Sequence, residues 1–155
     1  QLVGYPIFDL KPDRCDVHQY VRDLEEALIV AMRRFGIEGG RVKGLTGVWV
    51  GLQGREEKLA AIGVRISRWI TSHGFALNVE NQLAGFRYIV PCGIRDGEVT
   101  SLARELGEKR LPSWEDLCAR VHAAFERVFG RPLRLIVGGE GLELAKRERE
   151  AENGE

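Results

Sequence analysis

The chain has 155 residues and a mass of 17.4 kDa, which suits one domain large enough to bury a sizeable core. Lysine plus arginine and aspartate plus glutamate both total 23, so the net charge of zero argues against a general binder of nucleic acid or anionic membranes. Three cysteines without a C-x-x-C pair or a secretory segment favour free thiols in the cytoplasm. No apolar run reaches the ~20 residues that span a bilayer. No motif leads us to expect a cofactor or a metal.

The first part of the chain predicts a strand followed by an amphipathic helix. The strand is Leu2–Asp9. Asp16 is a suitable N-cap, and apolar residues recur every three or four positions from Val17 to Phe35, after which Gly36 ends the helix. The charged residues between the apolar ones, Glu25 among them, are assigned to the solvent side.

The middle of the chain predicts several strands. Glycines scattered among apolar residues from Gly39 to Gly54 favour two short strands joined by a turn. Leu59–Ile70 and Ser72–Val79 have the composition of longer strands. Lys58 heads the first of these and is expected at the rim of the sheet, and Gly74 in the second would let another backbone or a ligand approach closely.

The last part predicts one clear helix and leaves one segment open. Val99–Leu106 fits either a strand that continues into a loop or a short helix. Ser113 opens a second helix with a buried apolar stripe. Leu133–Val137 is predicted to be a last short strand, so that residues 1–138 make one domain and residues 139–155 a charged tail that is frayed or weakly helical.

The residues around Cys92 predict a turn that presents its thiol, because Pro91 cannot continue a ladder and Gly93 accepts unusual backbone angles. A free thiol with a pKa near ~8.5 is only about 3% ionised at pH 7, so a nucleophilic role needs a cation or a helix terminus beside it. Lys58 is the candidate cation. The residues alone leave a second interpretation open, in which Cys92 is a small buried hydrophobic side chain.

Three stretches of the chain, Lys58–Val79, Pro91–Ile94 and Val99–Gly107, closely resemble the octanoyltransferase family of lipoate synthesis. The resemblance implies an α/β (α+β) fold with a mixed β-sheet and packed helices, like the catalytic domain of biotin and lipoyl protein ligases. It also implies that Cys92 is the nucleophile and that Lys58 activates it. The family's contacts to the acyl substrate match two segments, Ala61, Ile62 and Gly63, and Gly74, Phe75 and Ala76.

The resemblance implies partners as well. Octanoyl-acyl carrier protein would donate the acyl group to Cys92, and a lysine of the lipoyl domains of 2-oxoacid dehydrogenases or of the glycine cleavage H protein would accept it. Gly63 and Gly74 would leave room for the acyl chain, and His73 is a possible further contact. Backbone N–H groups of a turn at Ala61–Gly63, or around Cys92, would stabilise the oxyanion.

The sequence departs from the family at its start. The family has an N-terminal, glycine-rich and basic segment that forms part of the substrate site, and it does not precede Leu2 in this sequence. Two explanations stay open: this sequence leaves that part out, or a truncation has removed one wall of the pocket. Two alternatives stay open. One is an ATP-dependent lipoate or biotin protein ligase, and the other is a non-catalytic module that binds acyl chains or lipoyl domains.

Overall fold

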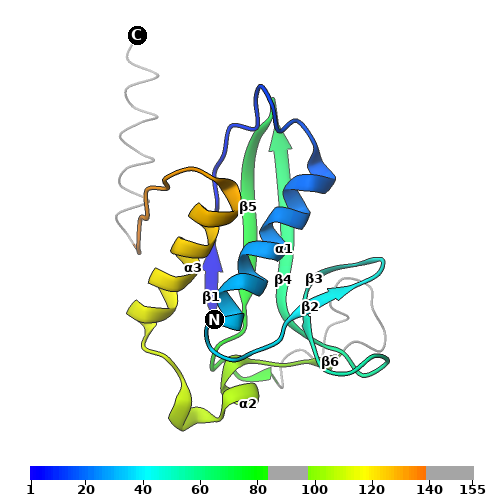
Figure 1. Cartoon of the computed structure of the whole chain (residues 1–155), viewed down its shortest axis with the longest axis vertical. Coiled ribbons are helices and arrows are strands. Elements are labelled where there is room, and N and C mark those ends of the chain that lie inside the picture. The colour runs from blue at the N-terminus through cyan, green and yellow to red at the C-terminus, as the bar shows by residue number, and fades with distance from the viewer. Residues whose placement is uncertain (84–97, 139–155) are drawn as a thin grey trace.

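The structure, a computed structural model, describes residues 1–83 and 98–138. These residues form a six-stranded mixed sheet, and two long helices lie side by side on one face of it (Figure 1). The predicted fold class, helices packed on a mixed sheet, is confirmed. The predicted turn at Cys92 and the predicted charged tail lie outside the described residues.

The sheet is built mainly from antiparallel neighbours. Its path runs β1-β5-β4-β3-β2, and β6 lies parallel to β4. The two longest strands, β4 (Glu57–Ser67) and β5 (Ile70–Leu77), form a hairpin at the centre, where the sequence predicted strands at Leu59–Ile70 and Ser72–Val79. The other described strands are short: β1 (Leu2–Gly4), β2 (Gly40–Val42), β3 (Leu45–Val50) and β6 (Glu98–Val99).

The two helices on the sheet, α1 (Val17–Arg33) and α3 (Trp114–Phe129), confirm the two helix predictions. Asp16 and Ser113 cap them, because each side chain accepts the N–H group three residues further on, at 3.0 and 3.1 Å. Gly130 ends α3 in the left-handed region with φ +65°. Within residues 1–83 and 98–138, no helix is long and apolar enough to cross a bilayer.

The segment Val99–Leu106, for which the sequence left a strand and a short helix open, contains the end of a strand and a short helix. Val99 ends β6, and α2 (Leu102–Leu106) follows at once and ends at Gly107. A 3-10 turn, η3 (Glu108–Arg110), then leads toward α3. The chain therefore turns from the sheet into a helix within a few residues.

The first strand is shorter than predicted, because regular pairing with β5 stops after Gly4 and resumes only at a single bridge between Asp9 and Ile70. The main-chain oxygen of Pro6 accepts hydrogen bonds from the hydroxyl groups of Thr71 and Tyr20, at 3.0 and 3.2 Å. Proline cannot donate to a ladder. Side-chain hydroxyls therefore bind the main chain at Pro6, and main-chain bonding resumes where the N–H group of Thr71 donates to the Phe8 oxygen at 2.9 Å.

The predicted last strand, Leu133–Val137, is wrong. The N–H group of Leu133 donates to Glu126 Oε1 at 2.8 Å, and its oxygen lies 2.8 Å from His122 Nε2. Side chains of α3 thus bind the main chain of this segment, and no strand is assigned to it. Its apolar residues are largely exposed, Leu135 at 51%, so the apolar run that suggested a strand has no sheet to pack against.

The core between the helices and the sheet is rich in aromatic rings. Phe75 of β5 stacks on Phe125 of α3 with a centroid distance of 5.4 Å, and Phe8 stacks on Phe129 at 4.3 Å. The Phe75 contact shows which side of the central hairpin the helices cover. We call this side of the sheet the helix face.

Candidate active site around Lys58

Lys58 is the second residue of β4 and lies where three strands meet. Trp49 of β3 is its partner on one side, and Val99 of β6 is its partner on the other. The residue is only 5% exposed. The prediction that Lys58 heads this strand is confirmed. The lysine does not lie at a free rim, however, because its backbone has a strand on each side and its side chain is buried.

A β-bulge decides which face of the sheet carries Lys58. Val48 lies opposite Ala60 and Trp49 opposite Lys58, so one step along β3 corresponds to two steps along β4, and Leu59 is the extra residue. Opposed residues share a face, and successive residues of β3 alternate between faces. Ala60 belongs to the core beneath the helices. Trp49 and Lys58 therefore lie on the face opposite the helix face.

The Trp49 ring holds the amine of Lys58. The Nζ atom lies 4.7 Å from the ring centroid, and Trp49 is only 4% exposed, so the cation–π attraction acts in a partly dehydrated site. Within the described parts of the chain, no carboxylate lies at ion-pair distance from Lys58. An ammonium that no carboxylate neutralises is suited to stabilise a thiolate.

The two segments matched to acyl contacts are cross-strand partners in the hairpin of β4 and β5. The structure does not test whether they contact a substrate, but it brings them together from separate parts of the sequence. The pairs are Ala61 with Ala76, Ile62 with Phe75, and Gly63 with Gly74.

Only some of these residues share the face of Lys58. Phe75 stacks on α3, so Phe75 and its partner Ile62 lie on the helix face. Alternation along the strand places Ala61 and Gly63 on the opposite face, which also carries Lys58. A strip of small residues therefore runs along β4 next to the buried amine.

The two glycines of this hairpin have different surroundings. A Cβ atom on Gly74 would lie 2.3 Å from the main-chain oxygen of Gly4 and 2.4 Å from the Pro6 ring, which confirms the expected close approach of another backbone. A Cβ atom on Gly63 would meet no described atom within 4 Å. The space beside Gly74 is thus filled by the N-terminal segment, whereas no described residue fills the space beside Gly63.

The expected turn at Ala61–Gly63 is wrong, because these residues lie in the middle of β4. Their main-chain groups belong to a strand that pairs with β5, so they do not form the expected turn of oxyanion donors. His73, opposite Val64 in β5, has an exposed side chain and a φ of +62°. This backbone conformation costs roughly 1–2 kcal/mol in a residue with a Cβ atom, and a substrate contact by His73 stays a prediction.

Asn78 is a buried side chain that ties β5 to the segment beginning with β6. Its Nδ2 donates to the oxygen of Thr100 at 3.0 Å, and its own main chain bonds to Leu59 and to Leu102, both at 3.0 Å. The N–H group of Thr100 in turn donates to the oxygen of Lys58 at 3.1 Å. This network fixes the chain next to Lys58.

Cys92 lies outside the described residues, so its distance from Lys58 stays a prediction. The described chain resumes at Glu98, and Val99 is paired with Lys58. Seven residues lead from Cys92 to Val99, and such a chain spans at most about 25 Å. The covalent chain thus limits how far Cys92 can lie from the buried amine.

Trp49 and Asn78 were not predicted as site residues from the sequence. A signal for Trp49 was available, because counting outward from a tight turn centred on Gln53 and Gly54 pairs position 49 with position 58. Asn78 had no comparable signal. A buried amide that bonds to a segment more than 20 positions further on, as in the Asn78 bond to Thr100, is visible only once the strands are assembled.

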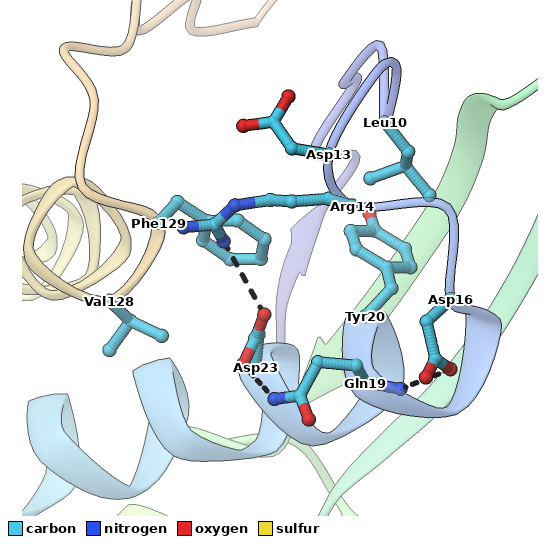
Figure 2. Close-up of a pocket in the computed structure, with 9 residues that line it drawn as sticks. All are labelled: Leu10, Asp13, Arg14, Asp16, Gln19, Tyr20, Asp23, Val128 and Phe129. Carbon is cyan, nitrogen blue, oxygen red and sulfur yellow. Dashed lines mark hydrogen bonds and ion pairs between the residues drawn. The ribbon is translucent and has the colours of Figure 1, made fainter.

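A hollow of about 420 Å³ lies away from Lys58, between the start of α1 and the end of α3 (Figure 2). Its polar side chains bond to one another, since Asp23 accepts from Gln19 Nε2 at 2.8 Å and lies 3.5 Å from Arg14 Nη1. We assign the hollow to the packing of the helix ends. The lining contains none of the predicted site residues and consists of Leu10, Asp13, Arg14, Asp16, Gln19, Tyr20, Asp23, Val128 and Phe129.

Comparison with known proteins gives sequence relatives. Residues 1–126 match the family model described as the lipoyl protein ligase A/B catalytic domain. Octanoyltransferases from Synechococcus elongatus and Solibacter usitatus are 52% and 53% identical to the chain over 129 residues, which is 83% of the chain in both cases. These matches cover 52% and 55% of the relatives, so the chain spans about half the length of the curated relatives it matches.

Solved structures give the same fold at low identity. A bipartite lipoate protein ligase from Thermoplasma acidophilum matches with a TM-score of 0.60 and 16% identity, over 94% of this chain and 56% of that chain. A lipoate-protein ligase A bound with ATP matches with a TM-score of 0.59 and 14% identity, over 94% of this chain and 57% of that chain. At such identities the likeness shows the fold alone.

Proposed function

The chain belongs to the lipoyl protein ligase A/B catalytic domain family, and on this premise we propose that the protein is an octanoyltransferase. It moves an octanoyl group from acyl carrier protein, through a thioester on Cys92, to a lysine of a lipoyl domain. The observation that carries the proposal is the buried Lys58 amine, which has no described carboxylate partner and lies beside a strip of small residues. Relatives that share about half of its residues are named octanoyltransferases.

In the first step the Cys92 thiolate attacks the carbonyl carbon of the donor thioester. A carbon–sulfur bond to Cys92 forms, the donor's carbon–sulfur bond breaks, and the departing thiolate takes a proton from the Lys58 ammonium. If Lys58 lowers the pKa of the thiol by about two units, the thiolate fraction at pH 7 rises from about 3% to roughly three quarters. Octanoyl-Cys92 and neutral Lys58 remain.

In the second step the acceptor lysine amine attacks the same carbon of octanoyl-Cys92. A carbon–nitrogen bond forms and the Cys92 carbon–sulfur bond breaks, which regenerates the thiolate. The proton that the attacking amine loses passes to the neutral Lys58, and the ammonium is restored. One lysine thus serves both half-reactions, and ping-pong kinetics follow.

The acyl chain needs an apolar slot, and the face of β4 beside Ala61 and Gly63 offers one wall for it. Burial of each methylene contributes about 0.8 kcal/mol, so six methylenes supply about 5 kcal/mol for chain-length selection. The space at Gly63, which no described residue fills, suits a chain laid along this strand. Ile62 and Phe75 would act from the helix face, by holding the hairpin in place.

The partners and compartment follow from the same chemistry. The proposed donor is octanoyl-acyl carrier protein, and the proposed acceptors are lipoyl domains of 2-oxoacid dehydrogenases and the glycine cleavage H protein. The reaction uses a free thiol and no cofactor, so the reducing cytoplasm is the proposed compartment. Residues 1–138 would belong to the catalytic domain, and residues 139–155 would form a charged tail.

The test gives the intact protein a lipoyl domain as acceptor and compares two donors, octanoyl-acyl carrier protein without ATP and free octanoate with ATP. We expect transfer from the carrier protein alone, and a loss of at least about a thousandfold in Cys92→Ser. ATP-dependent transfer from free octanoate, retained in Cys92→Ser, would point to a ligase and overturn the proposal. Octanoyl binding without any transfer would point to a binding module.

A further inference from the structure

We infer that Glu25 of α1 is a positioning residue for Lys58, acting through the backbone of Gly47. The inference rests on the proposed function, because it concerns the lysine that activates Cys92. The hydrogen bonds of Glu25 within the described chain go to Gly47 and Arg41, not to the amine. Its carboxylate instead holds the part of β3 against which the Lys58 side chain lies.

The side chain of Lys58 lies directly against Gly47. A Cβ atom placed on Gly47 would be 3.4 Å from Lys58 Cε and 3.6 Å from Lys58 Cδ. It would also lie 2.6 Å from the main-chain oxygen of Ala60, so only glycine fits. Gly47 has a φ of +131°, which residues with a side chain rarely adopt. Gly47 and the Trp49 ring together confine the lysine stem and its amine.

Glu25 holds the backbone at this point. Its Oε1 accepts the N–H group of Gly47 at 3.0 Å, and this bond is buried. Its Oε2 accepts from Arg41 Nε at 2.9 Å. The residue is 6% exposed, although the sequence analysis placed it on the solvent side of the helix. A buried carboxylate that accepts a backbone N–H group makes a strong, charge-assisted bond.

These contacts connect α1 to Lys58, because Glu25 binds the backbone of Gly47 and Gly47 lies against the lysine side chain. Gly47 does not appear among the paired positions of β3 and β4, which begin with Val48 opposite Ala60. Glu25 thus takes the place of a ladder partner for the N–H group of Gly47. Loss of this acceptor would let the backbone rotate and move the surface that confines the lysine stem.

Glu26 provides a matched control on the same helix. Its Oε2 accepts from Arg41 Nη2 at 2.8 Å, and its side chain is 42% exposed. It therefore shares a helix and an arginine partner with Glu25 but makes no described contact with Gly47. Glu25→Leu removes the acceptor and keeps the volume and the helix propensity, whereas Glu25→Gln keeps an oxygen that can accept the Gly47 N–H group.

The experiment makes two sets of measurements on the intact protein. The first is the rate of Cys92 alkylation by iodoacetamide as a function of pH, together with kcat and KM for octanoyl transfer. The second is competitive acetylation of Lys58 relative to the exposed Lys43, read by peptide mass spectrometry. The labelling ratio does not depend on transfer, so it tests the positioning role even if the proposed function fails.

We expect Glu25→Leu to lower kcat at least tenfold with KM changed less than threefold, to raise the midpoint of the alkylation profile, and to raise Lys58 labelling relative to Lys43 at least threefold. Glu25→Gln and Glu26→Ala should stay within threefold of the wild type in every quantity. Equal behaviour of Glu25→Leu and Glu26→Ala would overturn the inference. If Glu25→Leu does not fold, Arg41→Met replaces it with the same expected direction, and no change in the labelling ratio overturns the inference.

Discussion

The side-chain amide of Asn78 donates to the main-chain oxygen of Thr100 across 3.0 Å, and this bond joins the end of β5 to the strand beside Lys58. Both residues are buried. Their contact matters for the proposed reaction because the described chain resumes after Cys92 with β6, immediately before Thr100. The bond thus fixes this part of the chain relative to the buried amine.

The first prediction concerns this bond. Asn78→Ala leaves the Thr100 oxygen without its side-chain donor, so the free energy of unfolding should fall by about 1–3 kcal/mol. Octanoyl transfer should fall with it, because β6 loses its anchor beside Lys58. Urea denaturation and a transfer assay measure the two effects. Gln53→Ala, which removes an exposed amide from the turn before β4, serves as the control, and equal effects of the two substitutions would refute the prediction.

The second prediction uses the contrast between the two hairpin glycines. Gly74→Ala should lower the free energy of unfolding by about 1–3 kcal/mol, because its methyl group would collide with the Gly4 oxygen and the Pro6 ring. Gly63→Ala should change it by less than about 0.5 kcal/mol or raise it, because its methyl group would meet no atom of residues 1–83 and 98–138 and alanine suits a strand better than glycine. Chemical denaturation of both variants decides, and a larger loss in Gly63→Ala would contradict the assignment.

The third prediction is the pH dependence due to Tyr20. Burial raises the pKa of the Tyr20 phenol above its ordinary value, and a hydrogen bond to Thr71 partly opposes this. Above a pH of about 10 the unfolded chain therefore loses this proton while the folded protein keeps it. The contribution of Tyr20 to stability is complete below that pH and is lost as the pH rises toward the folded pKa.

Tyr20→Phe should accordingly flatten the decline in unfolding free energy between about pH 9 and about pH 11.5. Tyr5→Phe is the matched control, since Tyr5 is 67% exposed, and it should keep the slope of the wild type. Denaturant titrations at several pH values measure the slopes. The account fails for Tyr20 if its variant declines as steeply as the wild type.

The two main helices could be predicted from the sequence because their signals are local. Asp16 and Ser113 are capping residues followed by apolar stripes, and a cap needs only residues three positions away. The buried position of Glu25 could not be predicted in this way. Its partners, Gly47 and Arg41, lie 22 and 16 positions further on, so the helical pattern alone places Glu25 with the charged residues that face solvent.

The candidate site was predictable in its residues but not in its geometry. Resemblance identified Lys58 and the two small-residue segments, whereas strand alternation alone would place Lys58 and Ala60 on one face. The extra residue Leu59 reverses this relationship, and a single bulge leaves no clear mark in a sequence of apolar residues. The strand predicted at Leu133–Val137 failed for the opposite reason, since its composition was right but side chains of α3 bind its main chain at Leu133 in place of a neighbouring strand.

The fourth prediction tests the role of Lys58. In Lys58→Met, a side chain of similar length fills the same place against Trp49 without a charge, so the fold should persist. Alkylation of Cys92 at pH 7 should slow by about tenfold or more, and the midpoint of its pH profile should rise toward about 8.5. The exposed Lys43→Met controls for loss of a positive charge. An unchanged alkylation midpoint in Lys58→Met would show that this lysine does not activate the thiol.

The most direct test of the whole account is intact-mass spectrometry of the protein mixed with octanoyl-acyl carrier protein in the absence of an acceptor. The account predicts that one octanoyl group is added, that peptide mapping places it on Cys92, and that a lipoyl domain then removes it. Lys58→Met should acquire the same group at least tenfold more slowly. An unmodified protein, or an octanoyl group on a residue other than Cys92, would contradict the thioester mechanism.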